Sequence, residues 1–236
     1  MHGWIILDKP LGLGSTQAVS AVKRALRQGD YGKFKVGHGG TLDPLASGVL
    51  PVAIGEATKL AGRMLDSDKI YDFTIQFGIE TDTLDAEGKV IATSEVRPTL
   101  TQVEAVLPRF MGAISQVPPI YSALKVDGER AYDLARAGEE VTLASRDVVI
   151  HSLSIRHPRE SGEPSPENAG SGAGQEIGPR FRGGDEVEEI TLSAHVSKGT
   201  YIRSLARDIA QALGTVGHVT YLRRIKAGPF GLDSAI

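Results

Sequence analysis

The sequence predicts a globular protein that combines α-helices with β-strands, and two hydrophobic patterns lead to this prediction. From Tyr71 to Phe77, aromatic and aliphatic residues alternate with polar ones, which is the pattern of a half-buried strand. From Ile202 to Leu213, apolar residues recur at intervals of three and four, which is the pattern of an amphipathic helix. With 236 residues, the chain is long enough for one large domain or two small ones.

The remaining elements follow from the same patterns, taken along the chain. Expected strands are 3–7, 146–155 and 190–196. The first expected helix starts at Ser15 or Thr16, either of which can cap it, and ends at Gly29. The other expected helices are 56–65, 101–110 and 129–137. Pro108 must kink or end the helix that contains it.

One segment, 157–185, has a different composition. Seven of its 29 residues are glycine and four are proline, and it has almost no apolar periodicity. Such a stretch cannot bury enough surface to offset the entropy of ordering its chain. We expect a disordered insertion at the tip of a loop.

Composition excludes several classes of protein. The chain is 41% hydrophobic and 23% charged, which is ordinary for a globular protein. No apolar run approaches the roughly 18 residues of a membrane span, and the start of the chain lacks the features of a signal peptide. The chain has no cysteine, which excludes disulfides and thiolate metal sites. We therefore expect a cytoplasmic protein with no membrane partner.

A glycine-rich loop at 37–48 surrounds a single carboxylate, Asp43. Glycine is needed where the chain turns sharply or another molecule comes close, and Pro44 restricts how the aspartate leaves the backbone. This layout suits a nucleophile or a general base. It also suits an ordinary Asp-Pro turn between glycines, and the loop alone does not separate the two interpretations.

Other polar groups allow two interpretations each. The Tyr71 hydroxyl is either a polar handle on a core residue or a catalytic group. Lys125 and Arg130 interleave with tyrosines, a mixture that suits phosphates and stacked bases but is also common on surfaces. Basic residues between Lys198 and Lys226 indicate either an anionic partner, on a protein of net charge −3, or a solvated helix face.

Neither the acidic run at 81–88 nor any other group of acidic and histidine residues has the spacing of a known metal site. We interpret the run as an acidic turn between strands and expect no metal.

Taken together, these stretches resemble the TruB family of pseudouridine synthases. The matching motifs, in family order, are Asp8–Pro10, Gly37–Gly48, Gly55–Lys59, Lys69–Tyr71, Thr81–Thr83, Pro119–Lys125, Lys198–Arg203 and Leu222–Arg224. They extend from Gly3 to about Phe230, apart from the insertion.

The resemblance implies an α+β fold, with a mixed, mostly antiparallel sheet flanked by helices and an RNA-binding cleft. It implies one catalytic domain at 1–232, interrupted by the insertion, without the further C-terminal RNA-binding domain that bacterial relatives carry. The implied activity is the isomerisation of uridine 55 (standard tRNA numbering), in the T-arm of tRNA, to pseudouridine. The implied enzyme is a monomer that works without cofactor or guide RNA.

The resemblance also implies roles for individual residues. Asp43 would be the nucleophile, at the ribose C1′ or at uracil C6, and Arg203 would pair with it and keep it ionised. Tyr71 would stack on the target base and take a proton. The implied substrate-binding residues are His38, which holds the flipped nucleotide, Tyr201, Lys125, Arg130 and Leu222. Gly39 and Gly217 depart from the family pattern, and we expect both to loosen the backbone.

Three other functions compete with this one. An RNA chaperone would remodel tRNA without relying on chemistry, and a guide-dependent synthase would need a second RNA. A structural protein would leave the set of motifs unexplained.

Overall fold

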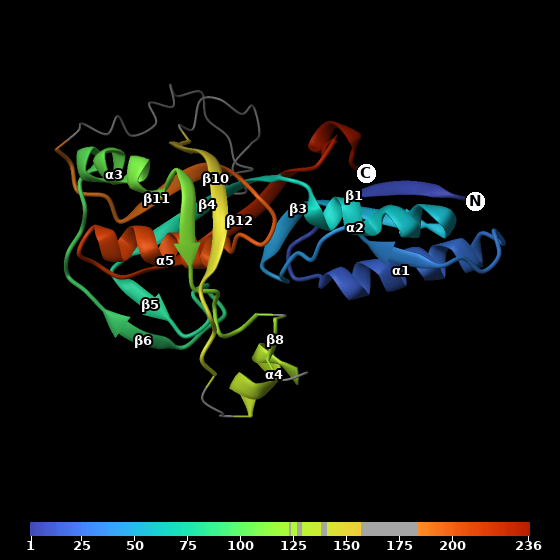
Figure 1. Cartoon of the computed structure of the whole chain (residues 1–236), viewed down its shortest axis with the longest axis horizontal. Helices are drawn as coiled ribbons and strands as arrows, with labels where there is room; N and C mark the ends of the chain where they lie inside the picture. The colour runs from blue at the N-terminus through green and yellow to red at the C-terminus, as the bar shows by residue number, and fades with distance from the viewer. Residues whose placement is uncertain (123, 127–128, 138–140, 157–183) are drawn as a thin grey trace, which may run out of the picture.

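The computed structural model describes residues 1–122, 124–126, 129–137, 141–156 and 184–236 (Figure 1). The insertion expected at 157–185 lies outside these residues, apart from its last two. No described helix is long and apolar enough to cross a membrane.

A nine-stranded sheet runs through the molecule in the order β1-β3-β12-β4-β11-β10-β7, with β2 beside β3 and β13 beside β12. Its strands are β1 (Gly3–Lys9), β2 (Val36–His38), β3 (Ala46–Ile54), β4 (Lys69–Phe77), β7 (Gly112–Gln116), β10 (Arg146–Ile155), β11 (Glu189–Val196), β12 (Gly217–Ala227) and β13 (Phe230–Gly231). The pair β3–β12 is parallel, and the other pairs are antiparallel. The expected mixed, mostly antiparallel sheet is therefore confirmed.

Two smaller pairs of strands lie apart from this sheet. They are β5 (Ile79–Thr81) with β6 (Val90–Thr93), and β8 (Lys125–Val126) with β9 (Glu129–Arg130). The acidic run at 81–88 joins β5 to β6, so the expected acidic turn between strands is confirmed.

Helices cover the two ends of the sheet (Figure 1). Helix α1 (Ser15–Gln28) packs with β2 and β3 in one hydrophobic cluster. Helices α3 (Leu100–Val106) and α5 (Ile202–Ala212) pack with β4, β10 and β11 in another. Tyr71 and Leu222 contact both clusters, which places these two side chains where the two halves of the core meet.

Several helix boundaries differ from those expected. Helix α1 begins at Ser15 as predicted, but Gly14 is its N-cap residue, because the Ser15 hydroxyl is used elsewhere. The segment expected as one helix at 56–65 is a 3₁₀-helix (Gly55–Leu60) followed by α2 (Ala61–Asp66). Pro108 lies in a second 3₁₀-helix (Leu107–Phe110) that follows α3. Helix α4 (Ala131–Arg136) is shorter than expected, because β9 takes its first two residues.

Gly39 and Gly217 permit close packing, so the expectation that they loosen the backbone is wrong. A Cβ on Gly39 would lie 2.5 Å from the Met64 Cβ, so its absence lets α2 approach the loop. A Cβ on Gly217 would lie 3.0 Å from the Ala210 Cβ and 3.0 Å from the Gln76 carbonyl oxygen. Both glycines are needed where two elements meet.

Candidate active site

Asp43 lies in a turn that leads directly into β3. The Asp43 carbonyl accepts a hydrogen bond from the Ala46 amide at 3.0 Å, which closes the turn. The Asp43 side chain is 42% exposed, so its carboxylate is open to solvent on one side. Asp43 is therefore presented at the beginning of a buried strand.

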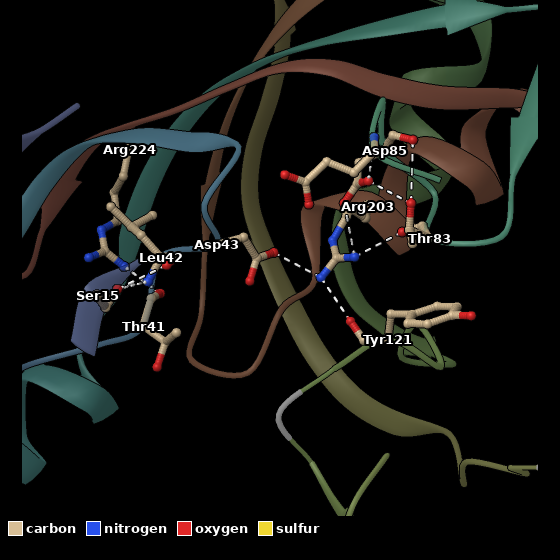
Figure 2. A network of polar contacts seen from close by, with 10 residues as sticks. Ser15, Thr41, Leu42, Asp43, Thr83, Asp85, Tyr121, Arg203 and Arg224 are labelled. Carbon is tan, nitrogen blue, oxygen red and sulfur yellow. Dashed lines mark hydrogen bonds and ion pairs between the residues drawn. The ribbon is translucent and has the colours of Figure 1, made fainter. Parts of the chain in front are cut away.

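The Ser15 hydroxyl fixes the backbone on one side of Asp43 (Figure 2). It donates to the Leu42 carbonyl at 2.9 Å and accepts from the Leu42 amide at 2.8 Å. On the other side, the Gly12 amide donates to the Pro44 carbonyl at 2.8 Å. The loop between β1 and α1 thus holds both neighbours of Asp43.

Arg224 on β12 fixes the same loop from a second direction. Its guanidinium donates to the carbonyls of Gly40 at 3.2 Å, Thr41 at 3.3 Å and Val49 at 2.7 Å, and the residue is only 1% exposed. Gly48 makes this arrangement possible, because it has φ of 98° and a Cβ there would lie 2.2 Å from the Arg224 carbonyl oxygen. Arg224 therefore acts as a buried support for the turn.

We predict that Ser15→Ala lowers the free energy of unfolding by about 1–3 kcal/mol, because it leaves a buried amide and a buried carbonyl of Leu42 without their partner. Urea unfolding monitored by circular dichroism measures this difference. Ser20→Ala is the matched control, since the exposed Ser20 hydroxyl bonds only the Thr16 carbonyl of its own helix. Equal stability of the two variants would contradict the proposed clamp.

Arg203 on α5 connects Asp43 to a second carboxylate, that of Asp85 (Figure 2). Its Nη2 lies 2.8 Å from Asp43 Oδ2, and its Nη1 lies 3.1 Å from Asp85 Oδ2. The guanidinium also donates to the carbonyls of Thr83 at 2.8 Å and Tyr121 at 3.1 Å. Because the Arg203 side chain is 8% exposed and Asp43 is much more open, Asp43 is the accessible member of this buried network.

Sequence reasoning did not identify Asp85. Its carboxylate is held in turn by the Thr83 hydroxyl at 2.6 Å and the Glu87 amide at 3.1 Å, and the residue is 7% exposed. An acidic turn is usually solvated, so its composition alone gives no sign of burial. The large apolar side chain of the adjacent Leu84 was the available signal that part of this turn is buried.

A small pocket adjoins this network. It is lined by Asp43, Leu45, Ala46, Asp85, Arg203, Val219, Thr220, Tyr221 and Leu222. Of the residues predicted for the site, the structure brings Asp43, Arg203 and Leu222 together here. Tyr71, His38 and Tyr201 lie outside this lining, among the residues that the structure describes.

These three residues have different surroundings. Tyr71, on β4, contacts the same two hydrophobic clusters as Leu222. The His38 Nδ1 atom, on β2, is buried and has no hydrogen-bond partner within the described part of the chain. Burial, with a smaller effect of the Arg224 charge, lowers the pKa of His38, so its imidazole is neutral near pH 7.

Tyr201 stands directly before α5, where its amide donates to Gln116 Oε1 at 2.8 Å. The Arg146 guanidinium lies 5.4 Å from the centre of the Tyr201 ring, within the range of a cation–π contact. Burial raises the pKa of the Tyr201 phenol, although the charge of Arg146 opposes the shift. The Tyr201 hydroxyl therefore stays protonated and uncharged at neutral pH.

Lys125 and Arg130 lie on β8 and β9, but their side chains fall outside the described part of the structure. The Tyr121 carbonyl that accepts from Arg203 lies just before this hairpin, so the backbone leading into the hairpin is attached to the network.

Five of the six lysines and arginines from Lys198 to Lys226 contact a carboxylate or a backbone carbonyl, and the sixth, Lys226, is exposed. Lys198 pairs with Asp66 at 3.0 Å and Arg207 with Asp208 at 2.8 Å. Arg203 contacts Asp43 and Asp85, Arg223 contacts Asp8, and Arg224 contacts backbone carbonyls. The expectation of a solvated helix face is therefore wrong for Arg203, which is 7% exposed, and the anionic partner stays a prediction.

Comparison with known proteins identifies the family. Residues 23–172 match the model of the TruB family pseudouridylate synthase N-terminal domain, and residues 203–236 match that of the tRNA pseudouridylate synthase B C-terminal domain. The tRNA pseudouridine synthase B of Novosphingobium aromaticivorans is 63% identical over all of this chain, which covers 70% of that protein. The protein of the same name from Zymomonas mobilis is 58% identical, again over the whole chain, with 69% of its own length covered.

Solved structures with the same fold are more distant in sequence. A Cbf5-Nop10-Gar1 complex contains a chain that is 28% identical, with a TM-score of 0.63, over 97% of this chain and 50% of the other. An H/ACA RNP bound to a substrate RNA contains a chain that is 25% identical, with a TM-score of 0.64, over 99% of this chain and 50% of the other. This protein thus spans about half the length of these structural neighbours. The family-model match and the identity to these relatives agree with the fold, and the chain belongs to the TruB family of pseudouridine synthases.

Proposed function

We propose that this chain isomerises uridine 55 in the T-arm of tRNA to pseudouridine, with Asp43 as the nucleophile. The observation that carries the proposal is the asymmetry of the Arg203 network, in which the Asp85 side chain is 10% exposed and that of Asp43 is 42% exposed. One carboxylate is thereby fixed inside the protein, while the other is oriented by the same guanidinium and remains accessible to a nucleotide.

The reaction is an internal rearrangement. The bond from uracil N1 to ribose C1′ breaks, the base rotates, a bond forms from C5 to C1′, and the hydrogen on C5 is released as a proton while N1 gains one. A carboxylate suits this sequence because it can form a covalent adduct and then leave again. Asp43 would form that adduct at C1′ or at uracil C6.

The other predicted site residues would bind and orient the nucleotide. Arg203 would hold the Asp43 carboxylate in place beside the pocket. Tyr71 and Leu222, at the junction of the two cores, would contact the base, and Tyr71 would take a proton. His38, whose imidazole is neutral near pH 7, would help to hold the flipped nucleotide, whose extrusion costs a few kcal/mol.

Three more predicted residues would contact RNA around the pocket. Tyr201 would contact the RNA with an uncharged ring beside the pocket, and Lys125 and Arg130 would contribute positive charge from the β8–β9 hairpin. We place the catalytic domain at 1–232, because one sheet connects both hydrophobic clusters across this range.

We propose that tRNA is the partner and that no guide RNA is needed. The relatives with 58–63% identity are named tRNA pseudouridine synthase B, whereas the complexes named for H/ACA RNPs are more distant. A monomer in the cytoplasm, where tRNA is found, completes the proposal.

The test uses two tRNA transcripts, one with uridine at position 55 and one with cytidine there, each incubated with the purified protein alone. We expect one pseudouridine per molecule of the first transcript, mapped to position 55, and none in the second. Product at other uridines, or product only after a guide RNA is added, would contradict the proposed substrate and partner.

A further inference from the structure

Three side chains that can bind a metal ion meet on the sheet away from the pocket residues. Asp68 directly precedes β4, His151 belongs to β10 and His195 to β11. The Asp68 Oδ2 atom lies 3.4 Å from His151 Nε2 and 3.9 Å from His195 Nε2, and one potential ligand atom from each residue lies within 4.8 Å of the other two. We call these residues the His-His-Asp cluster.

Strand register explains how these residues come together. His195 pairs with Ile70, and Asp68 is two residues before Ile70, so His195 and Asp68 are neighbours on one face of the sheet. The register between β10 and β11 shifts between Ile150 and Ser152, which leaves His151 as an extra residue opposite His195. Such a bulge redirects a side chain and lies at functional positions more often than elsewhere.

We propose that the His-His-Asp cluster binds one Zn²⁺ ion. Two imidazoles and one carboxylate are a ligand set that suits zinc, and tetrahedral bonds of about 2.0–2.2 Å place ligand atoms about 3.3–3.5 Å apart. The separations from Asp68 Oδ2, 3.4 and 3.9 Å, need only small side-chain rotations to reach this geometry. The fourth position would hold water.

Exposure and charge are consistent with an ion at this place. The three side chains are between 37% and 49% exposed, so an ion from solvent can reach them. The two imidazole rings lie with centroids 4.7 Å apart. A bound cation would give the two Nε2 atoms and the carboxylate one shared partner. The neighbouring Asp66 is occupied by Lys198 at 3.0 Å and so remains outside the cluster.

Spacing along the chain could not show this cluster. Its members come from three different segments, and only the pairing β4–β11–β10 brings them together. The expectation of no metal rested on local spacing, which this proposal does not use.

The test is isothermal titration of the untagged full chain with ZnCl₂, after metal has been removed with EDTA and the chelator dialysed away. We expect one ion per chain, and a fall in affinity of at least about 10-fold for His151→Ala, for His195→Ala and for Asp68→Asn. Asp66→Asn is the matched control, because Asp66 is an exposed carboxylate at the end of α2, two residues before Asp68, and its loss should leave the affinity unchanged. Circular dichroism of each variant checks that the fold is kept.

A second readout uses Co²⁺ in place of Zn²⁺, because its visible absorption is strong in a tetrahedral site and weak in an octahedral one. The wild-type protein should give the strong spectrum, and His151→Ala should lose it. No saturable zinc binding by the wild-type protein would overturn the proposal and leave the cluster as a set of polar contacts between Asp68 and the two histidines. Zinc binding that survives both histidine substitutions would overturn it as well, since the ion would then lie elsewhere.

Discussion

Asp43→Asn is expected to abolish isomerisation while leaving tRNA binding within a few-fold of the wild-type value. The amide has the shape of the carboxylate but is a poor nucleophile, so the covalent adduct cannot form. The release of tritium from C5-labelled uridine in a tRNA transcript measures the reaction, and filter binding measures the affinity. We expect the rate to fall by at least about 10³-fold, because removal of a catalytic nucleophile typically lowers kcat by this much or more.

The matched control for this substitution is Asp66→Asn, which makes the same chemical change at an exposed carboxylate outside the pocket. It should retain the wild-type rate. An Asp43→Asn protein that is folded, binds tRNA and releases tritium within about 10-fold of the wild-type rate would remove Asp43 from the proposed mechanism.

Arg203→Ala should lower both the rate and the stability. It leaves the carboxylates of Asp43 and Asp85 without their shared counter-charge, and removing one member of a buried ion pair costs about 3–5 kcal/mol. Asp43 also loses the contact that orients it, so we expect the rate of tritium release to fall by about 10²-fold or more. Urea unfolding and single-turnover tritium release measure the two effects separately.

Arg207→Ala is the control for this variant, since it lies one helical turn further along α5. Arg207 pairs with its neighbour Asp208 and donates to the Val117 carbonyl at 3.1 Å. Partly exposed pairs of this kind contribute about 0–1 kcal/mol. Equal losses of activity in the two variants would show that the helix, and not the Asp43–Arg203 contact, is what matters.

Most of the secondary structure could be predicted because its patterns are local. The strand β4 and the helix α5 lie where alternation and three-and-four spacing predicted them. The expectation that β4 is half-buried is wrong, because Asp72 and Thr74 on its polar face are buried as well. Helix caps were less accurate where tertiary contacts decide them. Ser15 is the clearest case, because its hydroxyl bonds Leu42 far along the chain and does not cap α1, although the helix begins there as predicted.

The site was predictable to the extent that its chemistry lies in motifs. The loop made Asp43 a candidate, and the family resemblance supplied the predicted roles of Asp43 and Arg203. Asp85 could not be predicted, because the sequence of a short acidic turn does not indicate which basic side chain will pair with it in the folded protein. Arg224 was similarly hidden, since only the parallel pairing of β3 with β12 brings its guanidinium under the loop.

The measurement that tests the central claim most directly is single-turnover tritium release by the wild-type chain, in excess over an unmodified tRNA transcript labelled at uridine C5. The account predicts one equivalent of tritium per transcript, with pseudouridine at position 55 as the only product. A folded protein that binds this tRNA and releases no tritium would contradict the account, and would favour a role in remodelling RNA.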